Sequence, residues 1–126
     1  MIACGYEIGA HSLDHPLYYD IPISEQVRQT TESMQLIKEK FKINYGAFSF
    51  PQNDRHVSRI FFNEIYNSKV INLTFGTDGF LKDVIKYNLQ RINVERSLFT
   101  PKKVFAMKLL RKIYNNITNT AIIERK

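Results

Sequence analysis

Segments with the period of a strand alternate with segments that have the period of a helix, and this alternation constrains the fold more than any other feature. The sequence predicts, in order, a strand, a helix, a strand, a helix, two strands and a helix. Such alternation favours parallel strands covered by helices, as in an α/β barrel or an open α/β sheet. With 126 residues and 14.8 kDa, the chain is long enough for one domain and too short for two.

Turn residues, caps and apolar spacing give the expected boundaries of these elements. We expect strands at residues 6–10, 45–50, 70–75 and 89–94. We expect helices at residues 24–42, 57–66 and 101–117. Ser24 and Thr100 are suitable N-caps, and Pro101 suits the first turn of the last helix. The residues expected to face the core from the middle helix are Ile60, Phe61 and Ile65.

Two histidines, His11 and His15, lie four residues apart where the first predicted strand ends. Side chains at the end of a strand can turn both imidazoles toward one point. Neutral imidazole is a good ligand for zinc and for neighbouring first-row metals. Two unrelated surface histidines would have the same spacing, and the spacing alone favours neither interpretation.

The residues around this pair favour a metal site. The segment from Gly5 to Pro16 reads GYEIGAHSLDHP. It resembles the metal-binding motif of the polysaccharide deacetylases (the NodB-homology carbohydrate esterases), Gly-x-Glu-apolar-Gly/Ala-x-His-Ser/Thr-x-x-His-Pro/Ser. Every defined position of the motif is matched. A helix and a strand that ends in a proline loop at Pro51 follow, as in the family, so that the resemblance extends from residue 4 to about residue 95.

The resemblance implies a distorted (β/α) barrel and the hydrolysis of N-acetyl (or O-acetyl) groups from a glycan. It implies that His11, His15 and an aspartate hold a divalent metal, commonly zinc. A metal-activated water attacks the acetyl carbonyl, and a second aspartate removes its proton. The implied partner is an acetylated polysaccharide or oligosaccharide, with no nucleic acid expected. The family acts outside the cytoplasm or at the cell envelope.

The sequence departs from the family pattern at its first motif. The family's Asp-Asp motif lies upstream of the paired histidines, but only ten residues precede His11 and none is aspartate. The catalytic base and the third ligand are therefore unassigned, and Asp14 is expected to face away from a shared metal. Three or four parallel strands do not close a barrel, which needs about eight. We expect residues 1–126 to form a single truncated domain that lacks its N-terminal strands and is inactive alone.

The proline loop departs from the family as well. The family places an arginine ahead of the proline, where this chain has Ser49 and Phe50. Arg91 is the candidate for the orienting role of that arginine, with a surface arginine as the alternative. The residues expected to line the substrate groove, or else to form a turn, are Pro51, Asn53 and Asp54. His56 is expected at the surface rather than at the site, so the catalytic acid is also unassigned.

Two other functions compete with this hypothesis. A non-catalytic glycan-binding or vestigial deacetylase-like module would use Tyr18 and Tyr19 to stack on sugars. The second alternative depends on charge. Residues 1–81 carry 7 Lys/Arg against 9 Asp/Glu, whereas residues 82–126 carry 11 against 3. A basic helix at about residues 100–118 could meet a membrane surface or nucleic acid, although we favour a solvated helix face over any specific partner. No apolar stretch approaches the roughly 18 residues of a membrane span.

Overall fold

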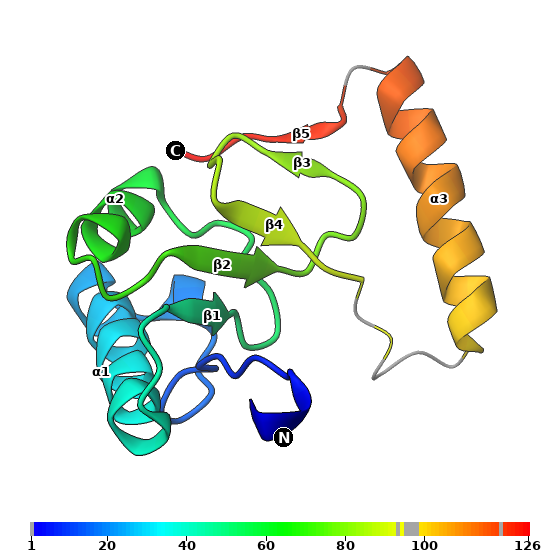
Figure 1. The fold of residues 1–126 in the computed structure, drawn as a ribbon. Coiled ribbons are helices and arrows are strands. Elements are labelled where there is room, and N and C mark those ends of the chain that lie inside the picture. The colour runs from blue at the N-terminus through cyan, green and yellow to red at the C-terminus, as the bar shows by residue number, and fades with distance from the viewer. Residues whose placement is uncertain (1, 93, 95–98, 119) are drawn as a thin grey trace.

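The computed structural model of the chain has a mixed α/β architecture (Figure 1). It describes residues 2–92, 94, 99–118 and 120–126. The central element is a three-stranded sheet with the order β1, β2, β4, and both neighbouring pairs are parallel. The bounds of its strands are β1 (Ala47–Ser49), β2 (Leu73–Gly76) and β4 (Asn88–Gln90). The strands therefore pair in parallel, as the alternation in the sequence predicts.

Helices α1 (Ile23–Phe41) and α2 (Arg59–Asn67) cover one face of this sheet (Figure 1). A cluster of aromatic rings fills the space between the helices and the sheet. Its fully buried members are Tyr18, Phe48, Phe50, Phe61 and Phe62. Neighbouring rings lie 5.2 to 5.8 Å apart between centroids, most of them edge to face. Burial of one such ring contributes about 1.5–3 kcal/mol, so the cluster fixes the helices against the sheet.

The two helices agree with their predicted positions to within two residues. Helix α1 begins after Pro22 rather than after Ser24 and ends before Lys42, which has a φ of 53°. Helix α2 has Ser58 as its N-cap, whose side chain accepts a hydrogen bond from the backbone N–H of Phe61. Ile60 was predicted to face the core, and this prediction is wrong because Ile60 is 58% exposed. The residues of α2 that are buried are Phe61, Phe62 and Ile65.

The register of the sheet separates a covered face from an open one. Phe48, Thr74 and Asn88 are paired in one row, and all three are buried beneath the helices. Successive side chains of a strand point to opposite faces, so the neighbouring row faces away from α1 and α2. That row contains Ser49, Phe75 and Leu89. Leu89 is 49% exposed, and the sheet therefore has an accessible face beside its buried one.

Several predicted strands are shorter than expected. The strand predicted at residues 6–10 is reduced to one parallel bridge between Ala10 and Phe48. The strand predicted at 89–94 ends at Gln90, and part of that prediction falls on residue 93, outside the described residues. Two short parallel strands were not predicted, namely β3 (Lys82–Asp83) and β5 (Ile122–Ile123). Short 3-10 helices occupy Ile2–Cys4 and Tyr18–Asp20. The described residues do not form a closed barrel.

Helix α3 (Pro101–Ile117) stands apart from the sheet and the other helices (Figure 1). Its bounds confirm the prediction, with Thr100 as N-cap and Pro101 in the first turn. Its buried side chains are those of Val104 and Asn115, and Phe105 contacts Phe80 with 5.3 Å between ring centroids. Its large exposed apolar side chains are Phe105, Met107, Leu109, Leu110, Ile113, Tyr114 and Ile117. Among the described residues, no helix is both long enough and apolar enough to cross a membrane.

Candidate metal centre

His11 leaves the sheet at the carboxyl end of its parallel strands. Two backbone hydrogen bonds hold Ala10, the residue before it, against β1. The N–H of Ala10 donates to Ala47 O at 2.8 Å, and its carbonyl accepts from Ser49 N at 2.9 Å. The carboxyl ends of parallel strands are where open α/β sheets bind their ligands. The sequence thus places the first histidine of the motif at the edge of the sheet that favours a site.

One hydrogen bond determines which nitrogen of His11 is free. The Nδ1 atom of His11 lies 2.7 Å from the backbone carbonyl oxygen of Ser49. A carbonyl oxygen can only accept, so Nδ1 carries the proton and donates it. In a neutral imidazole the lone pair is then on Nε2, which faces away from this bond. Metal-ligating histidines characteristically use one ring nitrogen in this way to orient the other.

The ring of His15 lies beside that of His11. Their centroids are 5.0 Å apart and their planes are inclined by 73°. Two imidazoles that ligate one tetrahedral zinc at about 2.0–2.1 Å have ring centroids roughly 5 Å apart. Edge-to-face rings that bind nothing also occur at such distances. The separation therefore fits a shared ion and an ordinary ring contact alike, and the bond to Ser49 adds only that Nε2 of His11 is left without a partner.

The loop between the two histidines is held in an unusual conformation. Ser12 and His15 both have a positive φ, of 69° and 61°. The hydroxyl of Ser12 accepts from His15 N at 3.0 Å. From α1, the buried Gln29 side chain accepts from Leu13 N at 3.0 Å and from Asp14 N at 3.4 Å. Gln29 was not predicted as a site residue, and no signal in the sequence points to it, because its burial is seen only in the structure.

A hollow of about 470 Å³ lies on the open face of the sheet next to His11. Arg91 and Glu7 line it together with apolar side chains such as Phe75. Arg91 follows β4, and its Nη2 donates to the carbonyl of Phe50 at 2.9 Å. Its Nε is buried and has no hydrogen-bond partner among the described residues. The structure thus brings Arg91 to the same hollow as His11, although the Nε without a partner is itself buried.

None of the three residues predicted to line the substrate groove is among those that line this hollow. Pro51 and Asp54 are buried, and Asp54 has 0% exposure. Asn53 is half-buried, and its side chain accepts from Arg55 N at 3.1 Å as in a turn. We therefore place Asp54 in the scaffold of the loop and not in a substrate groove, since its carboxylate is fully used by other side chains.

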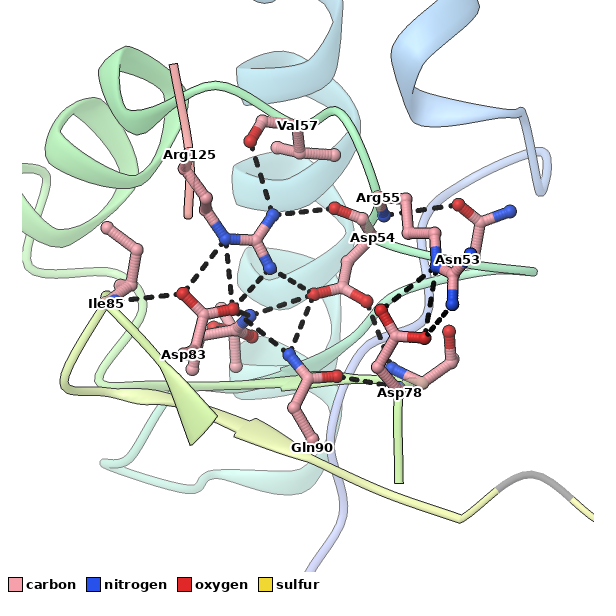
Figure 2. A network of polar contacts seen from close by, with 12 residues as sticks. Asn53, Asp54, Arg55, Val57, Asp78, Asp83, Ile85, Gln90 and Arg125 are labelled. Atoms are coloured by element: carbon pink, nitrogen blue, oxygen red, sulfur yellow. Dashed lines mark hydrogen bonds and ion pairs between the residues drawn. The ribbon is translucent and has the colours of Figure 1, made fainter. Parts of the chain in front are cut away.

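Those side chains form a polar cluster around Arg125 (Figure 2). The guanidinium of Arg125 pairs with the carboxylates of Asp54 and Asp83, and all three side chains are at most 1% exposed. Amide groups complete the cluster, because Asn88 Nδ2 donates to Asp54 at 2.9 Å and Gln90 Nε2 donates to it at 3.0 Å. We refer to Asp54, Asp83, Asn88, Gln90 and Arg125 as the Arg125 cluster.

The cluster favours the ionised forms of Asp54 and Arg125. Burial alone would raise the pKa of Asp54, but the hydrogen bond from Gln90, the charge of Arg125, and the bonds from Asn88 and the Thr77 N–H outweigh it. The pKa of Asp54 therefore lies below its ordinary value of 3.8. Burial likewise opposes the charge of Arg125, and Asp83 and Asp54 more than offset it, so that the pKa of Arg125 is raised.

The remaining polar and aromatic residues singled out in the sequence lie elsewhere. Tyr18 is fully buried, with its hydroxyl 2.9 Å from Thr30 Oγ1, so it cannot stack on a sugar. Tyr19 is 43% exposed and contacts the ring of His56 at 6.0 Å. Asp14 is exposed. In the described part of the chain, no group of three or more His, Cys, Asp or Glu side chains is placed to hold a metal ion.

Comparison with known proteins adds no family assignment. No protein-family model, no curated protein and no solved structure matches the chain significantly.

Proposed function

We propose that this chain belongs to a metal-dependent polysaccharide deacetylase domain of the NodB-homology type, with a partial (β/α) barrel fold. His11 and His15 would hold a divalent cation, with zinc the first choice for two imidazole ligands. The observation that carries the proposal is the bond from His11 Nδ1 to the Ser49 carbonyl at 2.7 Å, which leaves Nε2 free to ligate. The reaction would be hydrolysis of N-acetyl (or O-acetyl) groups on a glycan.

Each residue of the site would contribute a separate part of the chemistry. When bound, a divalent metal polarises a carbonyl and lowers the pKa of water to about 7 in favourable sites. His11 and His15 would supply two ligands, and Arg91 would bring a positive charge to the lining of the hollow. The described residues place neither a third ligand nor a base beside the pair. We therefore propose that the chain binds metal weakly and has little or no hydrolytic activity alone.

Zinc titration with matched histidine variants tests the ligand assignment. Isothermal titration of the full chain with Zn²⁺ should show one ion per chain. His11→Ala and His15→Ala should each lower the zinc affinity by more than tenfold, because loss of a ligand exceeds the 10–100-fold effect typical of its outer-shell partners. His56→Ala is the control and should leave the affinity unchanged, since His56 contacts Tyr19. Zinc binding that survives both His11→Ala and His15→Ala would show that the metal lies elsewhere.

Glycan binding with and without metal tests the reaction class. An N-acetylglucosamine oligomer and its deacetylated counterpart would each be titrated into the zinc-loaded chain and into the chain with a chelator. We expect a preference for the acetylated oligomer that requires zinc. Glycan binding that is unchanged by the chelator would instead indicate the non-catalytic glycan-binding module.

A further inference from the structure

The end of the chain reaches into the loop that follows β1. Arg125 lies just after β5, and its side chain is 1% exposed. Its Nη1 donates to two backbone carbonyls of this loop, that of Asp54 at 2.6 Å and that of Val57 at 3.2 Å. Figure 2 shows the guanidinium between these carbonyls and the two carboxylates with which it pairs. The guanidinium also lies over the ring of Phe62, 4.6 Å from its centroid.

The last residue of β1 and the first residue of the same loop supply the carbonyls that orient the proposed metal centre. The carbonyl of Ser49 accepts from His11 Nδ1, and the carbonyl of Phe50 accepts from Arg91 Nη2 at 2.9 Å. Four residues further along the chain, Asp54 is fixed by Arg125 and accepts from Thr77 N at 3.0 Å. The two carbonyls that orient the site and the two carbonyls that bind the guanidinium therefore lie in one short segment, residues 49–57.

The chemistry of the cluster suits a guanidinium and no other cation. Arg125 donates in five directions, to two carboxylates and two carbonyls, in a planar fork that lysine cannot reproduce. Without it, two buried carboxylates would lie together, and the loop would have to move to let water reach them. Any such movement begins four residues from the Phe50 carbonyl.

We propose that Arg125 is a positioning residue for the metal centre, which makes the last residues of the chain a part of that site's scaffold. The proposal rests on the proposed function, because it assigns the orientation of His11 and Arg91 to a side chain that touches neither. Loss of the guanidinium frees residues 49–57, weakens the bond between His11 and Ser49, and lowers the metal affinity of the folded chain.

The test compares two Arg→Lys substitutions in contact with the same loop. Arg125→Lys retains the charge and removes the fork, whereas Arg55→Lys changes an arginine that is 48% exposed and paired with Asp78. Three quantities are measured for each full-length variant: the Zn²⁺ affinity, the urea midpoint, and the tautomer of His11 from its ring ¹⁵N shifts. A purely structural role for Arg125 would change the urea midpoint alone.

We expect Arg125→Lys to lower the zinc affinity about tenfold, in the range of outer-shell effects on metal sites, and to reduce the Nδ1-protonated population of His11. Arg55→Lys should change neither quantity. A folded Arg125→Lys protein with the wild-type zinc affinity and His11 tautomer would overturn the proposal. If the unmodified chain does not bind zinc, the proposed function fails, and the His11 tautomer still decides whether Arg125 positions the loop.

Amide hydrogen exchange of the unmodified chain decides the question if Arg125→Lys does not fold. The N–H groups of Lys82 and Val84 donate to carbonyls of residues 121 and 123, so their exchange reports on the opening of β5. Within the loop, Val57 N donates to the Asp54 carbonyl at 3.3 Å and Arg55 N donates to Asn53 Oδ1 at 3.1 Å, so these two amides report on the loop. We expect all four amides to exchange as one cooperative unit. Retention of Arg55 and Val57 protection while β5 opens would overturn the proposal.

Discussion

Two polar clusters lie near the same parallel sheet and differ in how they use their hydrogen-bonding groups. In the Arg125 cluster, the side chains of Asp54, Asp83 and Arg125 are at most 1% exposed and are paired with one another and with amide groups. In the histidine pair, both residues are exposed, and His11 uses one ring nitrogen on Ser49 and leaves the other free. The Arg125 cluster is therefore saturated, because its charged groups are paired within the protein, whereas the histidine pair is open, because one ring nitrogen is left for a ligand.

The largest expected effect comes from removing the cation of the saturated cluster. Arg125→Ala should lower the free energy of unfolding by about 3–5 kcal/mol, because it leaves two buried carboxylates without their partner. Arg55→Ala is the matched control and should cost at most about 1 kcal/mol, since the Arg55 side chain is 48% exposed and water can replace it at Asp78. Urea unfolding at neutral pH measures both. A cost for Arg125→Ala no larger than that of Arg55→Ala would show that water already reaches the cluster.

Acid should weaken the saturated cluster through Asp54. The pKa of Asp54 in the folded chain lies below 3.8, so its ionised form stabilises the fold. That contribution is complete above the pKa of the unfolded chain and is lost as the pH falls below about 4 toward the folded pKa. Asp54→Asn should therefore cost about 1.5–3 kcal/mol at pH 7, as for a hydrogen bond to a charged group. The difference between the two proteins should shrink at pH 3, as measured by urea unfolding, and an unchanged difference would contradict the assignment.

The tight packing of the saturated cluster predicts an effect at Gly76. A Cβ at this position would collide with the Asp54 carboxylate and the Gln90 amide. Gly76→Ala should cost about 1–3 kcal/mol, as other insertions into close-packed sites do. Thermal unfolding followed by circular dichroism measures the change. A variant as stable as the unmodified chain would mean that the cluster can shift without loss.

The difference between the clusters also determines what the sequence could predict. The histidine pair is local, since four residues separate its members, and a motif of twelve residues contains it. The Arg125 cluster joins residues 71 positions apart, and no spacing rule connects Asp54 with a residue near the end of the chain. Asp54 was therefore assigned to the substrate loop, because its buried partner could not be recognised.

In the fold too, features that are local in the sequence were predicted, and features that join distant residues were not. The start of α3 was predicted because Thr100 and Pro101 form a local signal that needs no tertiary contact. Strands β3 and β5 have two residues each, too few for a period, and they exist because residues near the C-terminus pair with residues 40 positions earlier. Ile60 was expected in the core, but Phe61, Phe62 and Ile65 fill the buried face of α2, and the aromatic cluster selects the larger rings.

The smallest expected effect concerns the open pair and the helix that supports it. Gln29→Leu removes the acceptor for Leu13 N and Asp14 N with little change in volume. We expect the zinc affinity to fall about tenfold, the lower end of outer-shell effects, because the loop between the histidines would no longer be held. Isothermal titration with Zn²⁺ measures this change.

Gln26→Leu is the control for that change on the same helix. Gln26 is also buried, but it donates to the carbonyls of Tyr18 and Ile21 and does not contact the loop between the histidines. Its substitution should lower the stability and leave the zinc affinity of the folded protein unchanged. If both variants lower the zinc affinity equally, the metal centre depends on the general stability of α1. If Gln29→Leu alone lowers it, the open pair depends on a specific polar contact just as the saturated cluster does.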